Sequence, residues 1–205
     1  LCKRYNVSKS VVREAVKILV AKGLLEVRRG NGTRVRQRAS WNLLDDDVLA
    51  WHQGVEPETN FLRKLIDVRL MLEPNAAFWA AGAATNEQIK EISKSHNDME
   101  NAKSIQEFVV ADAKFHRAVL RAANNELLTA MEGVIFSALL SSIKITNNDP
   151  IDNRERSLPL HYKILKAIET QNKERAEFAM RKHMADTYER LSKLLPELKS
   201  GVKKM

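Results

Sequence analysis

The sequence holds a single cysteine, Cys2, among its 205 residues, and it is also short of glycine, proline and aromatic residues. One cysteine excludes an internal disulfide and a cluster of thiolate metal ligands, as is typical of a protein from a reducing compartment. Seven glycines, five prolines and 6% aromatic residues favour helices over sheets. A chain of this length can bury one sizeable core and a small satellite domain. We therefore expect a mainly α-helical protein.

Long apolar runs are also absent. No run approaches the roughly 20 residues that a membrane-spanning helix needs. No basic and apolar leader precedes a small-residue cleavage site. We expect a cytoplasmic protein with no membrane partner.

Positive charge is concentrated in the first forty residues. The whole chain carries a net charge of +8, with 34 Lys and Arg against 26 Asp and Glu. Residues 1–40 hold eleven of the basic residues and two of the acidic ones, so this segment is +9 and residues 41–205 are −1. A compact basic module suited to a polyanion is therefore joined to a nearly neutral body with a different role.

The basic module begins with a turn and a helix that Ser8 is placed to cap. Apolar residues then recur every three and four positions and predict one stripe facing a small core: Val12, Ala15, Val16, Leu19 and Val20. Lys9, Ser10 and Arg13 lie in the first turn and a half, on the opposite face. The backbone N–H groups and the positive end of the helix dipole there favour a nearby phosphate.

A basic hairpin follows this helix. Gly23 ends the helix, and residues 24–29 and 33–36 alternate with a period of two about the turn Gly30-Asn31-Gly32, which predicts a β-hairpin with an Asn-Gly turn. A helix followed by a basic two-stranded wing is typical of a winged helix-turn-helix, whose helix enters the major groove of DNA. A charge run can also be a solvated surface, but this order of elements favours DNA binding.

Two stretches of this module, residues 7–16 (VSKSVVREAV) and 22–35 (KGLLEVRRGNGTRV), resemble the GntR family of bacterial transcription regulators. The resemblance implies that five positions contact or approach operator DNA: Ser8, Lys9 and Arg13 on the helix, and Arg29 and Gly30 at the wing tip. It also implies that a first helix and most of a second precede Leu1, so we expect the module to be incomplete at its N-terminus.

The junction between the two charge regimes is not a flexible linker. Leu44, Val48 and Trp51 share one helical face, which predicts a short linker helix that docks on the body. The junction is similar to that of sugar-acid-responsive GntR regulators, which hints at the ligand class. We therefore predict an incomplete winged helix-turn-helix over residues 1–38, a linker helix over 39–57 and a helical effector domain over 58–197.

Helix signals repeat through the body with short breaks. Capping-box spacings at Thr85 with Gln88 and at Ser104 with Glu107, and a cap at Asn172, mark helix starts. Pro74 is expected to kink or restart the first helix. The predicted helices span residues 59–82, 86–102, 105–123, 125–146, 157–170 and 173–195. Helices with such short connections form an antiparallel bundle, which can hold a polar site between facing helices.

One carboxylate and three histidines lie on apolar faces of this bundle. Asp112 and His116 are four residues apart and share a face with Phe and Val side chains, while His161 and His183 each lie on an apolar stripe of their own helix. Such histidines can be ordinary core residues. Burying Asp112 unpaired is unfavourable, however, and a divalent cation supplies its counter-charge. This donor set suits Zn, Ni or Cu better than Mg or Ca.

Three stretches, residues 112–120, 161–168 and 179–183, resemble the metal-bearing helices of the FCD effector domain in the FadR subfamily of GntR regulators. The resemblance implies that Asp112, His116, His161 and His183 hold a metal, often zinc or nickel, beside which a small carboxylate effector binds. Similar domains carry an arginine at the position of Arg69 that reaches into the effector cavity, where its guanidinium can pair with a carboxylate. The alternative for Arg69 is an exposed salt bridge to Glu73.

These expectations combine into a ligand-responsive transcription regulator, taken to be a repressor. One winged module contacts few bases, so we expect a homodimer on a palindromic operator. Three alternatives stay open: a metal sensor in which the cation is the signal, a purely structural metal, and a metalloenzyme with a DNA-associating arm. The absence of a His-Glu-x-x-His run, and of an obvious second carboxylate beside the site, argues against the enzyme.

Overall fold

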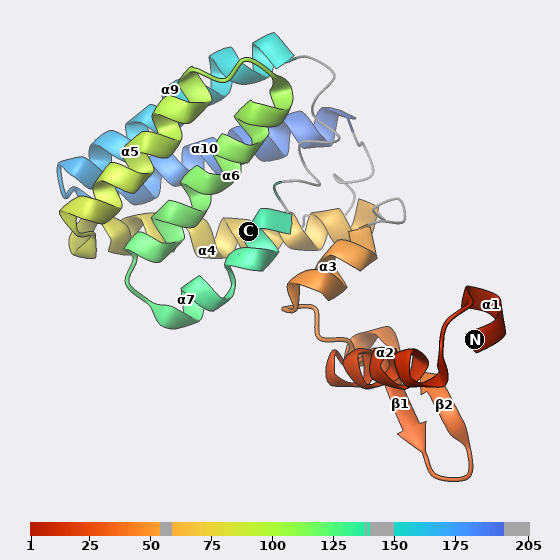
Figure 1. Ribbon diagram of the computed structural model, residues 1–205. Coiled ribbons are helices and arrows are strands. Elements are labelled where there is room, and N and C mark those ends of the chain that lie inside the picture. The colour runs from red at the N-terminus through yellow and green to blue at the C-terminus, as the bar shows by residue number, and fades with distance from the viewer. Residues whose placement is uncertain (54–58, 138, 140–149, 195–205) are drawn as a thin grey trace. The chain divides into compact units, whose positions relative to one another are not determined.

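The computed structural model describes residues 1–53, 59–137, 139 and 150–194, and it is mainly helical with one small sheet (Figure 1). This confirms the predicted fold class. Contacts divide the chain into two compact units, Leu1–His52 and Gln53–Met205. The finer division at residues 38 and 57 stays a prediction, as does the docking of the junction on the body. Among the described residues, no helix is long and apolar enough to cross a membrane.

The first unit begins with helices α1 (Cys2–Tyr5) and α2 (Lys9–Ala21). Ser8 caps α2 as predicted, because its Oγ accepts a hydrogen bond from the Val11 N–H at 3.3 Å. The predicted apolar stripe is wrong in part. Ala15 and Val20 are exposed, and the remaining three stripe positions are only half-buried, so α2 contains no fully buried residue.

Strands β1 (Leu25–Arg28) and β2 (Gly32–Val35) form the predicted antiparallel wing. The turn differs from the expected Asn-Gly type, which needs a positive φ at the asparagine. Here Gly30 and Gly32 take the positive φ angles, +82° and +76°. The Asn31 N–H donates to the Arg28 carbonyl at 3.0 Å and closes a three-residue loop. Both glycines serve this loop because a side chain is strained in the left-handed region.

The junction is tied to the winged module by charge and by close backbone approach. A short 3₁₀ turn (Arg38–Ser40) precedes helix α3 (Asp46–Gln53). The Lys22 ammonium lies 2.7 Å from Asp45 and 2.9 Å from Asp47, and the Asp45 carboxylate also accepts the Val48 N–H, so it caps α3. Gly23 has a φ of +76°, and a Cβ there would lie 2.7 Å from the Ser40 carbonyl oxygen.

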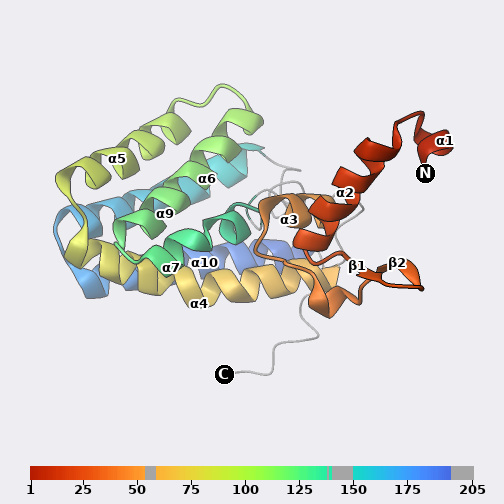
Figure 2. The ribbon, with the colours of Figure 1, turned by 60° about the horizontal axis from the view of Figure 1, so that its bottom comes forward.

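The second unit is a helical bundle. Its elements are α4 (Thr59–Ala83), α5 (Asn86–Glu100), α6 (Ile105–Ala122), α7 (Glu126–Ala130), α9 (Pro150–Glu169) and α10 (Lys173–Leu194). Helix α4 packs on α10 and α6, α5 packs on α6 and α9, and α9 packs on α10 (Figures 1 and 2). The main core cluster lies between these helices and includes Phe115, Ile164, Ile168 and Met180, all fully buried.

Most predicted helix starts are confirmed. Thr85 and Gln88 form the full capping box, and Asn172 accepts the Arg175 N–H at 2.9 Å. Ser104 caps α6, but the Glu107 carboxylate accepts from the Lys103 N–H instead of closing the box. The predicted restart at Pro74 is wrong, because α4 runs through it.

Two other helix predictions need correction. A helix spanning 125–146 is interrupted, because α7 ends at Ala130 with Met131 as its C-cap; its predicted end lies outside the described residues. Helix α9 begins at Pro150, seven residues before the predicted start. Proline is tolerated in the first turn because its missing N–H has no intrahelical acceptor there.

Candidate DNA-reading face and candidate metal centre

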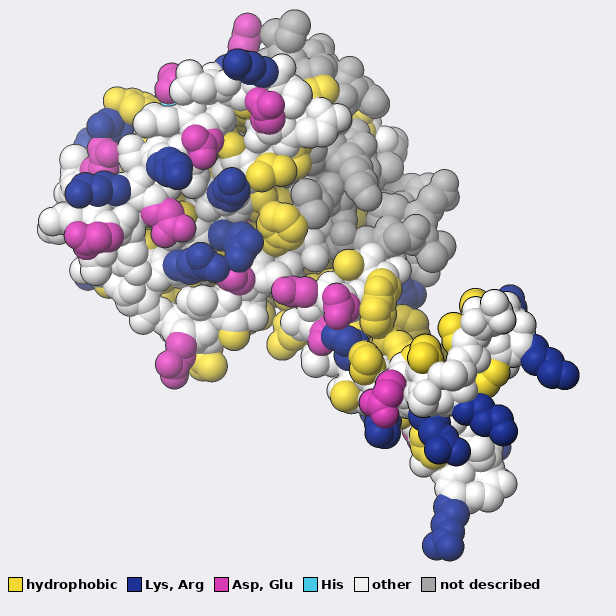
Figure 3. All heavy atoms as spheres, viewed as in Figure 1, with side chains coloured by type: hydrophobic (Ala, Val, Ile, Leu, Met, Phe, Trp, Pro, Cys, Tyr) yellow, Lys and Arg dark blue, Asp and Glu magenta, His cyan; other side chains and the backbone are white. Residues whose placement is uncertain are grey.

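The six residues predicted to meet DNA lie on the surface of the first unit. Ser8, Lys9, Ser10 and Arg13 are exposed at the start of α2, and Arg29 and Gly30 are exposed at the wing tip. Figure 3 shows Lys and Arg side chains over much of this unit. Among the described residues, no acid pairs with Lys9, Arg13 or Arg29, whereas Lys17 pairs with Glu14. These three charges are therefore available to phosphates or base edges.

The four predicted metal ligands come together inside the second unit. Asp112 and His116 extend from α6, His161 from α9 and His183 from α10. One potential ligand atom from each lies within 4.8 Å of all the others, and all four residues are buried. Phe115 on α6 presents ring contacts to both His116 and His161 and shields them from solvent.

The inner faces of these side chains converge on one point. Asp112 Oδ1 lies 2.9 Å from His161 Nε2 and 3.2 Å from His116 Nε2, and the two Nε2 atoms are 3.3 Å apart. The His183 ring stacks on His116, with centroids 5.2 Å apart, and its centroid is 4.2 Å from that of His161. Three nitrogen bases and a carboxylate oxygen thus point at a common centre.

The outer nitrogens of two of the histidines are held by acceptors. His161 Nδ1 donates to the Ser157 carbonyl oxygen at 2.9 Å, and His116 Nδ1 lies 2.5 Å from the Glu73 carboxylate. Each contact places a proton on Nδ1, so the Nε2 lone pair can face the centre. This is the arrangement that metal-ligating histidines use to fix tautomer and ring orientation.

A buried ion pair stands behind His116. Arg69 Nε lies 2.5 Å from the Glu73 carboxylate, and both side chains are only 1% exposed. The pairing of Arg69 with Glu73 was expected as an alternative, but its expected exposure is wrong. The expectation that no second carboxylate lies beside the site is also wrong, since Glu73 contacts His116 directly.

Glu73 was missed by the sequence analysis. Its position was nevertheless readable, because the spacing of Ile66, Glu73, Ala77 and Ala80 places it on the buried stripe of α4.

The electrostatics of the cluster follow from burial and close opposite charges. Burial alone would raise the pKa of Asp112, but the charges of His161 and His116 outweigh it and hold that pKa well below 3.8. Burial likewise opposes the ionisation of Glu73, yet Arg69 and His116 lower its pKa to about 2. Both carboxylates are therefore anionic at neutral pH.

The pKa values of two histidines, His116 and His183, are shifted in opposite directions. Burial would lower the pKa of His116, but Glu73 and Asp112 raise it to about 9, so without a metal this ring carries a proton on each nitrogen. Burial and the neighbouring charges of His161 and His116 lower the pKa of His183 well below 6.5. His183 is thus a neutral base, and a divalent cation at the centre would take the place of the inner proton of His116.

The residues present fit a metal. Within the described part of the chain, three buried atoms of the cluster make no hydrogen bond of good geometry: Asp112 Oδ1, His183 Nδ1 and His116 Nδ1, whose contact with Glu73 is an ion pair. Unsatisfied buried groups of this kind are unfavourable, and a cation would satisfy the carboxylate oxygen directly. One carboxylate and three imidazoles match the donors that zinc and related transition metals prefer.

Together the two units define a class of protein. A basic winged helix-turn-helix joined in one chain to a helical bundle is the architecture of a DNA-binding regulator. Comparison with protein families agrees. The profile described as bacterial regulatory proteins, gntR family, matches residues 1–35, and that of the FCD domain matches residues 64–186.

Individual relatives cover almost the whole chain. The galactonate operon transcriptional repressor of Escherichia coli (strain K12) is 31% identical over 195 residues, which cover 95% of this chain and 85% of that protein. The regulator LutR of Bacillus subtilis (strain 168) is 28% identical, covering 94% and 88%. Among solved structures, a Streptococcus agalactiae GntR protein has a TM-score of 0.59 at 27% identity, covering 93% and 85%.

The chain belongs to the GntR family of bacterial transcription regulators, and its helical unit is an FCD domain. Its domains and relatives are transcription regulators rather than enzymes, so the metalloenzyme alternative is dropped.

Proposed function

We propose that this regulator binds one divalent metal through Asp112, His116, His161 and His183, and that a small carboxylate effector binds beside the metal and alters operator binding. The observation that carries the proposal is the convergence of four buried ligand atoms within 4.8 Å of one another. The contacts of His116 with Glu73 and of His161 with Ser157 support it, because they turn two nitrogen lone pairs toward the centre.

Zinc or nickel suits this donor set best. The bound metal would supply a Lewis-acidic position at which an anionic oxygen of the effector can bind. The protein's own contribution is to hold the ligands: Glu73 orients His116, the Ser157 carbonyl orients His161, and Phe115 covers both rings. The buried surroundings of the centre keep competing water away.

We assign recognition of the effector's carboxylate to Arg69, whose buried guanidinium pairs with Glu73 behind His116. Arg69 is held by Glu73 through its Nε at 2.5 Å, while the second contact, from its Nη2, is long at 3.4 Å. The remaining guanidinium N–H groups can therefore receive a carboxylate. The similarity to a galactonate operon repressor supports a sugar acid or hydroxy acid as the ligand.

On DNA, we assign the reading of the operator to the start of α2 and the wing tip, with Ser8, Lys9, Ser10, Arg13, Arg29 and Gly30 as contacts. A homodimer on a palindromic site follows from the small number of bases that one module reaches. Repression is supported by the relative that represses the galactonate operon. Such a regulator acts on bacterial DNA in the cytoplasm. The effector changes operator affinity only if it binds the two states of the regulator differently.

The test is a thermal-stability screen of the full regulator with a panel of sugar acids and hydroxy acids, before and after removal of metal by a chelator. A ligand that needs the metal raises the unfolding midpoint in the loaded protein and loses this effect after chelation. His183→Gln should abolish both metal retention and the acid-dependent shift. His96→Gln is the matched control, since His96 is a buried histidine of α5 outside the cluster.

Operator binding separates the remaining alternatives. If chelation alone changes operator affinity in the absence of any acid, the protein is a metal sensor. If metal raises stability while no acid in the panel changes either stability or operator affinity, the metal is structural. A purified protein that retains no zinc or nickel after reconstitution, by elemental analysis, contradicts the metal site itself.

A further inference from the structure

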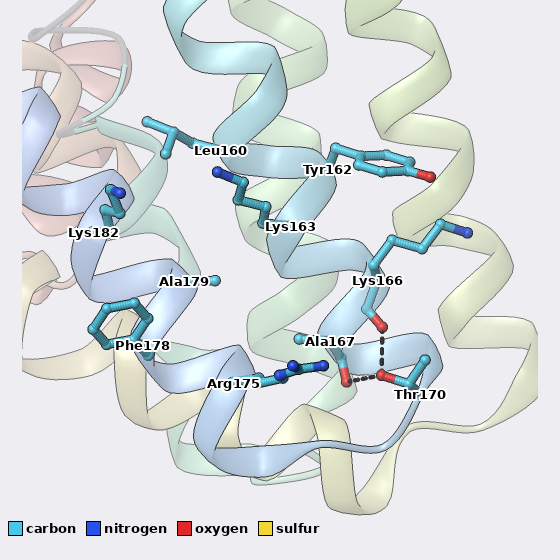
Figure 4. Close-up of a pocket in the computed structure, with 10 residues that line it drawn as sticks. All are labelled: Leu160, Tyr162, Lys163, Lys166, Ala167, Thr170, Arg175, Phe178, Ala179 and Lys182. Atoms are coloured by element: carbon cyan, nitrogen blue, oxygen red, sulfur yellow. Dashed lines mark hydrogen bonds between the residues drawn. The ribbon is translucent and has the colours of Figure 1, made fainter.

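The outer surface of α9 and α10 carries a groove with a hydrophobic floor and basic walls, with a volume of 370 Å³ (Figure 4). Ala167 on α9 and Ala179 on α10 form part of the floor. Because alanine side chains are short, they leave a hollow between the longer side chains on either side. Phe178 borders the hollow with 70% of its surface exposed, so its ring is accessible to a ligand in the groove.

The groove is surrounded by positive charge. Four of its lining residues are cationic, and none is acidic: Lys163, Lys166, Arg175 and Lys182. Lys166 is compensated, since it lies 2.6 Å from Glu169 and stands over the Tyr162 ring. Within the described residues, no acid pairs with the other three. Figure 4 shows the ammonium of Lys163 and the guanidinium of Arg175 reaching over the space between the two helices.

This groove is separate from the candidate metal centre. His161 is fully buried, while Tyr162 and Lys163, the next residues of α9, are exposed. On α10, His183 is buried and its neighbour Lys182 is exposed in the groove wall. On α9 the groove therefore lies on the side away from His161, and no residue that lines it is one of the four candidate metal ligands, so the groove is a second location for a ligand.

We propose that this groove binds a small amphiphilic anion, a molecule that joins an apolar body to a carboxylate, sulfonate or phosphate group. The uncompensated cations near one hollow attract a single anionic group, and the exposed Phe178 ring with the alanine floor removes an apolar body from water. The volume lies within the range of about 300–1,000 Å³ that small-molecule sites occupy. A flat surface for a protein partner would not need such a hollow.

The probe for this test is 8-anilinonaphthalene-1-sulfonate, whose fluorescence rises when its rings leave water and whose sulfonate supplies the anion. N-phenyl-1-naphthylamine is the matched uncharged probe. We expect saturable sulfonate binding at one site of the full chain. The double variant Lys163→Gln/Arg175→Gln should weaken it about tenfold or more, since it removes both charge-assisted hydrogen bonds to the sulfonate. Binding of the uncharged probe should be unchanged in this variant.

Two further variants make the comparison specific. Phe178→Ala should weaken both probes, because it removes the apolar contact. Arg181→Gln removes one positive charge from the same helix outside the groove, where Arg181 pairs with Glu177, and should change neither isotherm. All four substituted side chains are exposed, so far-UV circular dichroism should report an intact fold in each variant.

Four results would overturn the proposal, three from probe binding and one from light scattering. The first is equal binding of the sulfonate probe by the wild type and the Lys163/Arg175 double variant. The second is an equal loss in Arg181→Gln, which would indicate a general charge effect. The third is loss of probe binding on addition of a chelator, which would place the probe at the metal centre. If light scattering shows instead that Phe178→Ala converts a dimer into a monomer, a second copy fills the groove and the proposal is wrong.

Discussion

The carboxylate of Glu73 lies 2.5 Å from Nδ1 of His116, and this contact joins α4 to the cluster of buried side chains on α6, α9 and α10. The same carboxylate binds Arg69, so a buried chain of three charged groups runs from α4 to the proposed metal. Glu73 therefore acts as a positioning residue: it fixes the ring of His116 and supplies negative charge behind it.

Replacing Glu73 with Gln should weaken metal binding by about 10- to 100-fold, the usual effect of removing an outer partner of a metal-ligating histidine. The substitution also leaves the Arg69 charge unpaired in the core, so we expect a loss of about 3–5 kcal/mol in the unfolding free energy of the metal-free protein. A competition titration against a chromophoric chelator measures the affinity, and urea denaturation measures the stability. Glu155→Gln, at an exposed site on α9, is the control for both. Unchanged metal affinity in Glu73→Gln would show that the contact is only structural.

The DNA-reading face predicts a contrast between two cations of α2. Arg13 has no acidic partner among the described residues, whereas Lys17 is compensated by Glu14 at 2.7 Å. Arg13→Ala should lower operator affinity about tenfold or more, and Lys17→Ala should have little effect. Fluorescence anisotropy of labelled operator at several salt concentrations measures both, and the loss of a phosphate contact lowers the salt slope by about one. Equal effects of the two substitutions would place Arg13 outside the interface.

Two of the three glycines at positive φ in the first unit, Gly23 and Gly30, differ in their surroundings. A Cβ at Gly23 would lie 2.7 Å from the Ser40 carbonyl, while a Cβ at Gly30 would meet nothing within 4 Å. Gly30→Ala should therefore destabilise only by the left-handed strain of about 1–2 kcal/mol. Gly23→Ala carries the same strain and also displaces backbone, so its loss should exceed that of Gly30→Ala by 1 kcal/mol or more, on the order of other backbone clashes. Hydrogen exchange of β1 and β2 amides reports the difference, and similar protection in both variants would contradict it.

The ion cluster of Glu132 with Arg117 and Arg121 predicts a pH-dependent contribution to stability. The Glu132 carboxylate lies 2.7 Å from Arg117 and 2.8 Å from Arg121. Burial raises its pKa, but the hydrogen bonds and charges of the two arginines lower it below 4.5 overall. A lowered folded pKa stabilises the protein above the unfolded value, and this stabilisation is lost as the pH falls through the folded value.

We therefore expect Glu132→Gln to cost about 1 kcal/mol at neutral pH, since the group is only partly buried. The difference from the wild type should shrink as the pH falls below 4.5, the ordinary value. Urea denaturation across this range measures it. A difference that stays constant down to pH 3 would mean that the lost contact is not ionic.

Local signals predicted much of this structure because they act over a few residues. Ser8, Thr85, Ser104 and Asn172 cap their helices as their spacing indicated, since a cap depends on the next three residues alone. The break at Met131 carried no such signal. The start of α9 did carry one, because proline is favoured at the first position of a helix, and the predicted start at residue 157 overlooked Pro150. The wing was predicted, but which residues of its turn take positive φ depends on loop length and register.

The convergence of Asp112 with three histidines could be predicted because all four are polar residues on apolar helix faces, and the periodicity of the sequence reveals this conflict. Arg69 and Glu73 show the same conflict on α4, and their spacing also fits an exposed helical pair. That pair looks the same in a sequence whether it is buried or solvated. The structure differs from an exposed pair by a third group on a different helix. Glu73 also contacts the outer nitrogen of His116, which needs an acceptor.

The candidate centre draws its donors from positions far apart in the chain. Asp112 and His183 are separated by about 70 residues, and Glu73, which orients His116, lies about 40 residues before Asp112. A bound cation would close these long loops much as a crosslink does, and loop-closure entropy grows only slowly with length. The bundle must fold nearly completely before the donors meet, so a captured ion acts chiefly on unfolding. A bound metal should therefore lower the unfolding rate. A lower unfolding rate lengthens the lifetime of the folded regulator in the cell.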